Sequence, residues 1–277
     1  MSEGYDPALF KSLDEVEDRH FWFRARKRVV GSILRDLTAR LTPGYHVLEL
    51  GCGNGGMLRL LQECSPGGNV VGMDLFAQGL LNARKRSTCA LVQGDAGLPP
   101  FGEQFQIVGM FDVLEHIERD VAALRDVRRM LAPGGTIVIT VPAHMSLWSY
   151  FDQAAHHARR YSTHELAAKL RDAGFEVEYL TQFMAAIYPL VWLGRRVKSL
   201  LGASKDAVAR TQQELRITPG LNALLDRSLA GEERLVRQRR TMTLGTSILA
   251  VARKALAPSP QPVGGSSIAH TDATACR

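Results

Sequence analysis

Glycines and a carboxylate in the first third of the chain have the types and spacing needed to hold a nucleotide-like ligand. Gly51, Gly53 and the Gly55-Gly56 pair follow an apolar segment and precede a helical one. Glycines let the backbone turn tightly and approach a ligand closely. Asp74 ends the next apolar segment, where a carboxylate can accept both hydrogen bonds of a ribose diol. The pattern therefore predicts a nucleotide-binding loop.

The spacing Gly51-x-Gly53-x-x-Gly56 also fits the dinucleotide fingerprint, so NAD is one candidate ligand. Three features argue against NAD. The loop lies behind a helical N-terminal segment, and not at the start of the chain. Glu49, two residues before the first glycine, suits a cationic ligand better than a pyrophosphate. Asp95 ends the third apolar segment, where it can accept a hydrogen bond from an adenine amino group.

The elements that must position these residues alternate between apolar strands and helices from residue 45 to residue 141. A sixth strand is predicted at 175–180 and a last one at 246–254. Helices are predicted within 1–40 and between the strands, where turns such as Thr42-Pro43-Gly44 and Ala132-Pro133-Gly134-Gly135 separate them. This order predicts an α/β fold with a mostly parallel sheet covered by helices on both faces.

Five motifs resemble, in order and spacing, those of the class I S-adenosylmethionine-dependent methyltransferases: ELGCGNG, MDL, QGDA, FDVLEHI and LAPGGTIVITVP. The resemblance covers residues 20–181 and the last strand. It implies a Rossmann-like seven-stranded sheet of order 3-2-1-4-5-7-6, with S-adenosylmethionine as cofactor. It also implies that Glu49 and the glycine loop meet the methionine moiety, Asp74 the ribose and Asp95 the adenine. The cofactor-binding residues implied are Glu49, Gly51, Cys52, Gly53, Gly55, Asp74, Leu75, Asp95, Ala96 and Asp112.

Polar residues after the fourth and fifth strands are candidates for work on the acceptor. The sequence around 147–161 resembles a methyltransferase subgroup reading L-W-S-x-H-D-x-x-x-G-H-x-R-R-Y, but Phe151 replaces the usual His and His156 the usual Gly. Such a loop can deprotonate an acceptor or clamp an anionic one, or it can be a salt-bridged loop that anchors a lid. Likewise, His116 is either a general base or part of the wall of the cofactor pocket. The predicted catalytic residues are His116, Asp152, His157 and Tyr161, and the predicted substrate-binding residues are Trp22, Trp148, His156, Arg159 and Arg160.

The pattern divides the chain into five parts. Residues 1–40 form an N-terminal helical cap, whose HFWFR segment resembles the same subgroup and either covers the ligands or simply packs. The cofactor-binding core covers 41–182, and 244–257 adds its final strand. Residues 183–243 form a helical insertion between the sixth and seventh strands, interpreted as a substrate lid. Residues 258–277 are rich in Pro, Gly, Ser and Thr and are predicted to be a disordered tail.

The insertion combines an apolar run with basic residues. FMAAIYPLVWL at 183–193 is followed by a basic cluster, and the whole of 183–243 holds 11 Lys and Arg against 5 Asp and Glu. One interpretation is a pocket for an amphiphilic substrate with an anionic head, such as a prenyl phosphate or a lipid-linked sugar, or a peripheral membrane contact. The other is an amphipathic lid over the core. The leading hypothesis is a methyltransferase acting on a small or lipid-like metabolite.

Two other functions stay open. One keeps the cofactor but uses its sulfonium for chemistry other than methyl transfer. The other is nucleic-acid binding by the basic insertion, although no recognition-helix or RNA-binding motif supports a specific nucleic acid. The net charge of +6 over 277 residues indicates a mixed solvated surface.

Cysteines and apolar segments limit the remaining possibilities. The four cysteines lack C-x-x-C spacing, so we expect neither a metal site nor a disulfide framework. The first residues lack the apolar core of a signal peptide, and no apolar run approaches the roughly 18 residues that span a bilayer. The sequence therefore predicts a cytoplasmic protein, as a monomer or homodimer, with a small-molecule or amphiphilic substrate.

Overall fold

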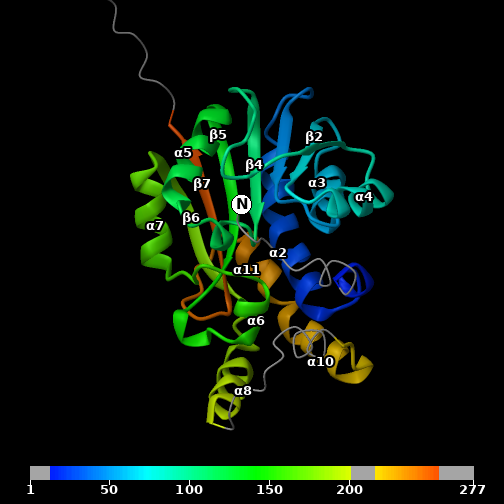
Figure 1. The fold of residues 1–277 in the computed structure, drawn as a ribbon, viewed down its shortest axis with the longest axis vertical. Helices are drawn as coiled ribbons and strands as arrows, with labels where there is room; N and C mark the ends of the chain where they lie inside the picture. The colour runs from blue at the N-terminus through cyan, green and yellow to red at the C-terminus, as the bar shows by residue number, and fades with distance from the viewer. Residues whose placement is uncertain (1–12, 201–215, 256–277) are drawn as a thin grey trace, which may run out of the picture.

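The computed structural model describes residues 13–200 and 216–255, and this part of the chain is built around a seven-stranded sheet (Figure 1). The sheet order is β3-β2-β1-β4-β5-β7-β6, which confirms the predicted order. The first five strands pair in parallel, and β7 is antiparallel to both of its neighbours. The strands are β1 (His46–Leu50), β2 (Asn69–Asp74), β3 (Ala90–Gln93), β4 (Phe105–Phe111), β5 (Leu131–Pro142), β6 (Phe175–Phe183) and β7 (Ser247–Lys254).

Both faces of the sheet are covered, because successive side chains of a strand point to opposite faces. In β1, Val47 joins the apolar cluster that contains residues of α2 (Phe21–Thr38), α3 (Gly56–Cys64) and α4 (Ala77–Arg86). Its neighbour Leu48 joins the cluster on the other face, with α5 (Asp120–Met130) and α7 (Thr163–Asp172). Burial on both faces explains why the strands read as continuous apolar runs.

The insertion begins and ends at one edge of the sheet. Ser247, the first residue of β7, pairs with both Pro142 at the end of β5 and Phe183 at the end of β6. The chain from 184 to 246 therefore leaves and rejoins the sheet at the carboxyl end of the parallel strands, where α/β sheets bind their ligands. Its described helices are α8 (Tyr188–Leu200), α10 (Pro219–Leu229) and α11 (Glu232–Arg237), and Figure 1 shows α8 and α10 beyond that end of the sheet.

The N-terminal helix and the insertion form one helical layer. Both α10 and α11 pack against α2. Asp226 of α10 pairs with Arg24 and Arg28 of α2, and the Asn222 side chain accepts the N–H of Phe21 at 2.8 Å. The two parts predicted as cap and lid are thus joined to each other by ion pairs and hydrogen bonds.

Some boundaries differ from those predicted. Phe183 and Met184 are fully buried, so the apolar run at 183–193 starts inside the core, and most of its exposed residues lie in α8. The third strand stops at Gln93, which leaves Asp95 in the following loop. The predicted tail, 258–277, lies outside the described residues. Among the described helices, none is both long and apolar enough to cross a membrane.

Candidate cofactor and acceptor site

The loop between β1 and α3 forms a tight backbone cradle. Gly51, Gly53 and Gly55 all have positive φ values, of 70°, 48° and 81°. A side chain at Gly51 would collide with Val113, which follows β4, and a Cβ atom at Gly55 would lie 2.7 Å from Cα of Ala83 in α4. Gly51 and Gly55 are therefore required both by the backbone conformation and by close packing, whereas at Gly53 the backbone conformation alone favours glycine.

Asp74 lies beside this cradle at the end of β2. Its carboxylate accepts the N–H of Gly53 at 2.7 Å and the N–H of Phe76 at 2.9 Å. Burial raises the pKa of Asp74, and the two backbone hydrogen bonds oppose that rise. The next residue, Leu75, leaves 41% of its surface exposed. The backbone therefore fixes the Asp74 carboxylate at the glycine loop.

Glu49 is the second buried carboxylate of the cradle. It lies near the end of β1 and is almost completely buried, and among the described residues its Oε2 atom has no hydrogen-bond partner. Burial raises the pKa of Glu49 well above its usual range, and the positive charge of Arg26 only partly offsets this. A buried acceptor without a partner is unfavourable unless a ligand completes it. The site is therefore chemically suited to a ligand that carries a positive charge or N–H donors.

The other predicted cofactor residues differ in their surroundings. Cys52 is buried within the loop, whereas Asp95 is exposed and accepts the N–H of Gly97 at 2.7 Å, with Ala96 half-buried between them. Asp112 has a positive φ of 56° and forms an ion pair with Arg26 of α2. This pair uses Oδ2 of Asp112 and ties the N-terminal helix to the loop after β4.

Arg26 is a site residue that the sequence reasoning missed. Its side chain is buried, lies 4.9 Å from the ring centroid of Trp22, and is close enough to affect the pKa of both Glu49 and Glu115. The sequence could have indicated this position, because Arg26 follows Phe23 by three residues and therefore lies on the same face of the helix. A basic side chain on the buried face of a helix needs a carboxylate partner, and here the partner is Asp112.

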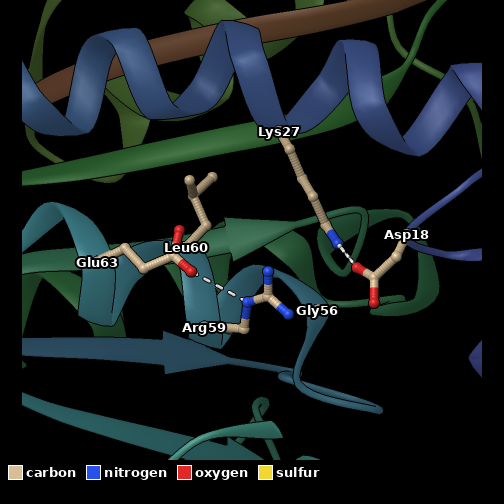
Figure 2. Close-up of a pocket in the computed structure, with 6 residues that line it drawn as sticks. All are labelled: Asp18, Lys27, Gly56, Arg59, Leu60 and Glu63. Atoms are coloured by element: carbon tan, nitrogen blue, oxygen red, sulfur yellow. Dashed lines mark hydrogen bonds and ion pairs between the residues drawn. The ribbon is translucent and has the colours of Figure 1, made fainter.

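A cavity of about 290 Å³ lies between α2 and α3 (Figure 2). Lys27 and Asp18 form an ion pair across it at 2.7 Å, and Arg59 pairs with Glu63 at 3.0 Å. Gly56 of the glycine loop lines this cavity, whereas Glu49 and Asp74 do not. The residues that line it are Asp18, Lys27, Gly56, Arg59, Leu60 and Glu63.

Glu17, which the sequence analysis did not select, lies next to this cavity. Its buried carboxylate contacts the position of Gly56, the first residue of α3. Amide groups at a helix N-terminus favour an anion, which accounts for a buried carboxylate there. Burial nevertheless raises the pKa of Glu17.

Asp152 organises the loop that follows β5. It belongs to α6 (Tyr150–Ala154), where Ser149 and Asp152 form a reciprocal capping box. The completely buried carboxylate also pairs with His157 Nδ1 at 2.9 Å and with Arg160 Nε at 2.7 Å. Burial alone would raise the pKa of Asp152, but the hydrogen bonds and charges of His157 and Arg160 outweigh it and lower the pKa to about 2.

Tyr161 and Arg159, predicted to serve catalysis and substrate binding, make contacts within the protein. Tyr161 is completely buried, and its hydroxyl donates to Asp120 at 3.0 Å. Arg159 pairs with the same carboxylate at 3.0 Å, and Lys169 of α7 completes the cluster. Since Tyr161 has no exposed surface, it reaches no acceptor in this conformation, and its observed role is to join the loop to the start of α5.

We expect Asp120→Asn to reduce stability in a pH-dependent way. Burial raises the pKa of Asp120, but hydrogen bonds from Lys169 and Tyr161 and the charge of Arg159 outweigh it and lower the pKa below its usual range. The ionised carboxylate should thus stabilise the fold by about 1.5–3 kcal/mol above pH 4, and this contribution should be lost as the pH falls through the lowered pKa. Urea unfolding of both proteins from pH 7 to pH 3 measures the difference, and a gap that does not narrow towards pH 3 would contradict the assignment.

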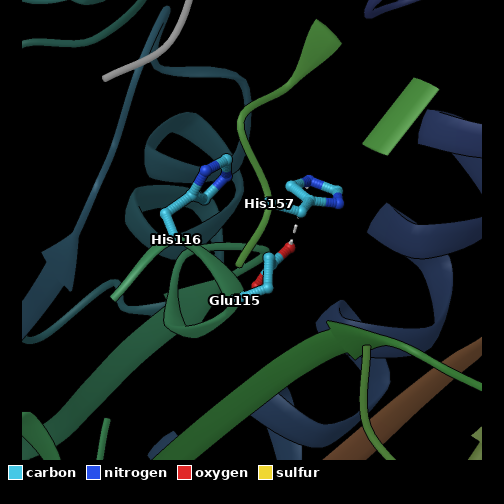
Figure 3. Close-up of side chains that lie close together, drawn as sticks. All are labelled: Glu115, His116 and His157. Atoms are coloured by element: carbon cyan, nitrogen blue, oxygen red, sulfur yellow. Dashed lines mark ion pairs between the residues drawn. The ribbon is translucent and has the colours of Figure 1, made fainter. Parts of the chain in front are cut away.

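His116 and His157 form a pair of imidazoles beside Glu115 (Figure 3). His116 ends η1 (Leu114–His116), the short helical turn after β4, and its ring centroid lies 4.8 Å from that of His157. Burial and the neighbouring His157 lower the pKa of His116 to about 3, so His116 is neutral at ordinary pH. His157 Nε2 lies 3.9 Å from Oε1 of the completely buried Glu115. The structure therefore brings three of the four predicted catalytic residues together, because His157 contacts both His116 and Asp152.

The other four predicted substrate-binding residues lie in different places. His156 is exposed, with a positive φ of 54°, whereas Trp148 is half-buried after η2 (Met145–Leu147). Trp22 is half-buried at the start of α2, where it stacks with the Arg26 guanidinium. Arg160 is buried against Asp152 and so supports the loop from inside.

Comparison with known proteins settles the family. Residues 21–180 match a family described as a methyltransferase domain. The chain belongs to the class I S-adenosylmethionine-dependent methyltransferases. A probable S-adenosylmethionine-dependent methyltransferase from Mycolicibacterium smegmatis is 28% identical, over 61% of this chain and 64% of that protein. The malonyl-[acyl-carrier protein] O-methyltransferase of Enterobacter lignolyticus is 29% identical, over 69% of this chain and 76% of that protein.

Solved structures agree on the fold. A chain from the complex between the Haloferax volcanii Trm112 methyltransferase activator and a methyltransferase aligns with this protein with a TM-score of 0.58. The alignment covers 91% of this chain and 95% of the chain in the complex. At 21% identity this likeness concerns the fold alone. The chain spans less than two thirds of the length of the first curated relatives that it matches.

S-adenosylmethionine, the cofactor of this methyltransferase family, fits the donor set at the carboxyl edge of the sheet. Its methionine end carries an ammonium group and its centre a sulfonium, and Glu49 offers an unpartnered buried carboxylate oxygen. Its ribose diol requires an acceptor such as Asp74, and the glycine backbone leaves room for close approach.

We expect cofactor binding by this methyltransferase to release a proton from Glu49. Burial keeps the pKa of Glu49 raised without a ligand, and a nearby positive charge lowers it, so the carboxyl group should release a fraction of a proton when the cation binds. Calorimetry in buffers of different ionisation enthalpy measures the release. Glu49→Gln should abolish it, and a binding enthalpy that is independent of buffer in the unaltered protein would contradict this prediction.

Proposed function

We propose that this protein transfers the methyl group of S-adenosylmethionine to a small acidic or amphiphilic acceptor. The observation that carries the proposal is that the parts of the candidate site lie at the same edge of the sheet. The cradle with Glu49 and Asp74, the His116–His157 pair and both ends of the insertion all lie at the carboxyl edge of one sheet. A cofactor held at that edge would face the helices of the insertion and the loop around Asp152.

The surface of the insertion supports an amphiphilic acceptor. Leu190, Trp192 and Leu193 of α8 are exposed, and the Arg196 guanidinium lies 5.3 Å from the Trp192 ring. Apolar side chains beside basic groups suit a ligand with an apolar body and an anionic head. An acidic acceptor is also in keeping with the similarity to a malonyl-[acyl-carrier protein] O-methyltransferase.

Different residues of this chain would hold the cofactor and border the acceptor. When bound, S-adenosylmethionine supplies an electrophilic methyl group, which an acceptor lone pair takes in line as the sulfur–carbon bond breaks. Glu49 and the glycine loop would hold the methionine end, and Asp74 the ribose. His116 and His157 would border the acceptor side, where Asp152 fixes the orientation of the His157 ring.

The cap at 1–40 and the insertion at 183–243 would act together as the cover of this site. Asp152 pairs within the loop and also lies 3.8 Å from Arg195 of α8, which links the loop to the insertion. His144, after β5, meets Tyr188 at the start of α8 edge to face, with ring centroids 5.5 Å apart. Closure of the cover would exclude water from the methyl group.

The test is formation of S-adenosylhomocysteine together with a methylated product. Purified protein is incubated with S-adenosylmethionine and a panel of carboxylates, acyl thioesters and prenyl phosphates, and both products are measured by mass spectrometry. We expect equal amounts of the two with at least one acidic or amphiphilic acceptor. Product without S-adenosylhomocysteine would indicate non-methyl chemistry, and turnover only with neutral polar acceptors would overturn the proposed substrate class.

A further inference from the structure

We propose that Glu115, His116 and His157 form a binding site for a divalent transition-metal cation of the zinc type. One potential ligand atom from each residue lies within 4.8 Å of those of the other two, as Figure 3 illustrates. Around a tetrahedral zinc ion with bonds near 2.1 Å, ligand atoms are roughly 3.4 Å apart. Small side-chain movements would therefore close the cluster around a cation.

The burial of Glu115 is the second observation that points to a ligand. The residue has no exposed surface, and within the described part of the chain neither carboxylate oxygen has a hydrogen-bond partner. The nearby guanidinium groups belong to Arg26 and Arg160, which already pair with Asp112 and Asp152. A buried carboxylate is costly without a counter-charge, and a cation held between Glu115 and the two imidazoles supplies one.

Each of the two histidine rings has a polar partner within the protein, as metal-binding histidines usually do. The Asp152 carboxylate lies 2.9 Å from Nδ1 of His157, which leaves Nε2 to face Glu115. His116 interacts with the backbone of His156, which fixes its ring from the other side. A carboxylate or backbone carbonyl on the second ring nitrogen orients the imidazole and makes it a better ligand.

The ligand set and its location define what the site would take. Two imidazoles and one carboxylate suit zinc and similar metals, whereas magnesium and calcium prefer oxygen ligands alone. Three protein ligands leave one coordination position of the metal open. The cluster lies next to the glycine loop, because Val113, just before Glu115 and His116 in the chain, packs directly on Gly51. Resting on the proposed function, we infer that the open position takes an anionic oxygen of the acceptor.

The test is direct metal binding by the untagged, full-length protein. After removal of metals with EDTA, zinc is titrated against a chromophoric chelator, and cobalt is added separately to record the visible spectrum of the bound ion. We expect one equivalent of zinc and a cobalt spectrum typical of mixed nitrogen and oxygen ligands. His116→Ala, His157→Ala and the isosteric Glu115→Gln should each weaken zinc binding at least roughly 100-fold. His164→Ala, at an exposed histidine of α7, is the matched control and should bind zinc as tightly as the unaltered protein.

Two controls keep this result separate from folding and from the proposed function. Cofactor affinity and circular dichroism are measured on every variant, and Glu115→Gln preserves the shape of the side chain if an alanine variant misfolds. Zinc binding that is equal in the unaltered protein and in His116→Ala/His157→Ala overturns the site. Zinc binding at this site without methyl transfer to any acceptor refutes the proposed function and leaves the metal site intact. Methyl transfer by a protein that binds no zinc in the titration supports the proposed function and refutes the metal site.

Discussion

Asp74→Ala is expected to weaken S-adenosylmethionine binding by roughly 100-fold. The variant would lose the two charge-assisted hydrogen bonds proposed between Asp74 and the ribose diol, which are worth on the order of 3 kcal/mol together. The same carboxylate accepts the N–H groups of Gly53 and Phe76, so its removal also loosens the loop that it holds in place. Isothermal titration calorimetry with S-adenosylhomocysteine measures the effect without any acceptor.

The matched control for this variant is Asp172→Ala, at an exposed aspartate at the end of α7. It removes the same charge far from the glycine loop and should leave the affinity unchanged. Asp74→Asn keeps the shape and one acceptor oxygen, so its affinity should fall between those of the unaltered protein and Asp74→Ala. Equal affinities of Asp74→Ala and Asp172→Ala would show that Asp74 does not hold the ribose.

Asp152→Ala should be the most destabilising single change around the acceptor loop. It leaves the buried Arg160 guanidinium without its carboxylate and removes the partner of His157 and the cap of α6. Removing one partner of a buried ion pair costs about 3–5 kcal/mol. For a protein of this size, we expect a fall in melting temperature of roughly 10 °C.

Chemical unfolding in urea measures this loss as a difference in the free energy of unfolding, again with Asp172→Ala as the surface control. Asp152→Ala/Arg160→Met should recover part of the stability, because an apolar side chain replaces the unpaired charge. If Asp152→Ala lies within about 0.5 kcal/mol of the control, Asp152 does not organise the loop.

The sequence by itself determined the order of elements and the cofactor cradle. Strand and helix alternate with strong apolar runs, because strands buried on both faces permit few polar residues. Glu49, the glycines and Asp74 could be selected because each lies at or just after the carboxyl end of a strand, where α/β sheets place their ligands. The positive φ values of Gly51 and Gly55 are backbone conformations that glycine adopts most readily, so the sequence itself indicates them.

Contacts between distant segments could be decided only by the tertiary structure. Arg26 meets Asp112 across 86 positions, and Glu17 reaches the start of α3, although neither pair has a spacing that a motif could reveal. Tyr161 looked like a catalytic hydroxyl in its polar loop, but the fold buries it completely against Asp120. The sequence also placed no metal ligands together, because His157 lies far along the chain from Glu115 and His116. Parallel strands end at a common edge, and only the packing of the loops at that edge brings these three side chains within reach of one cation.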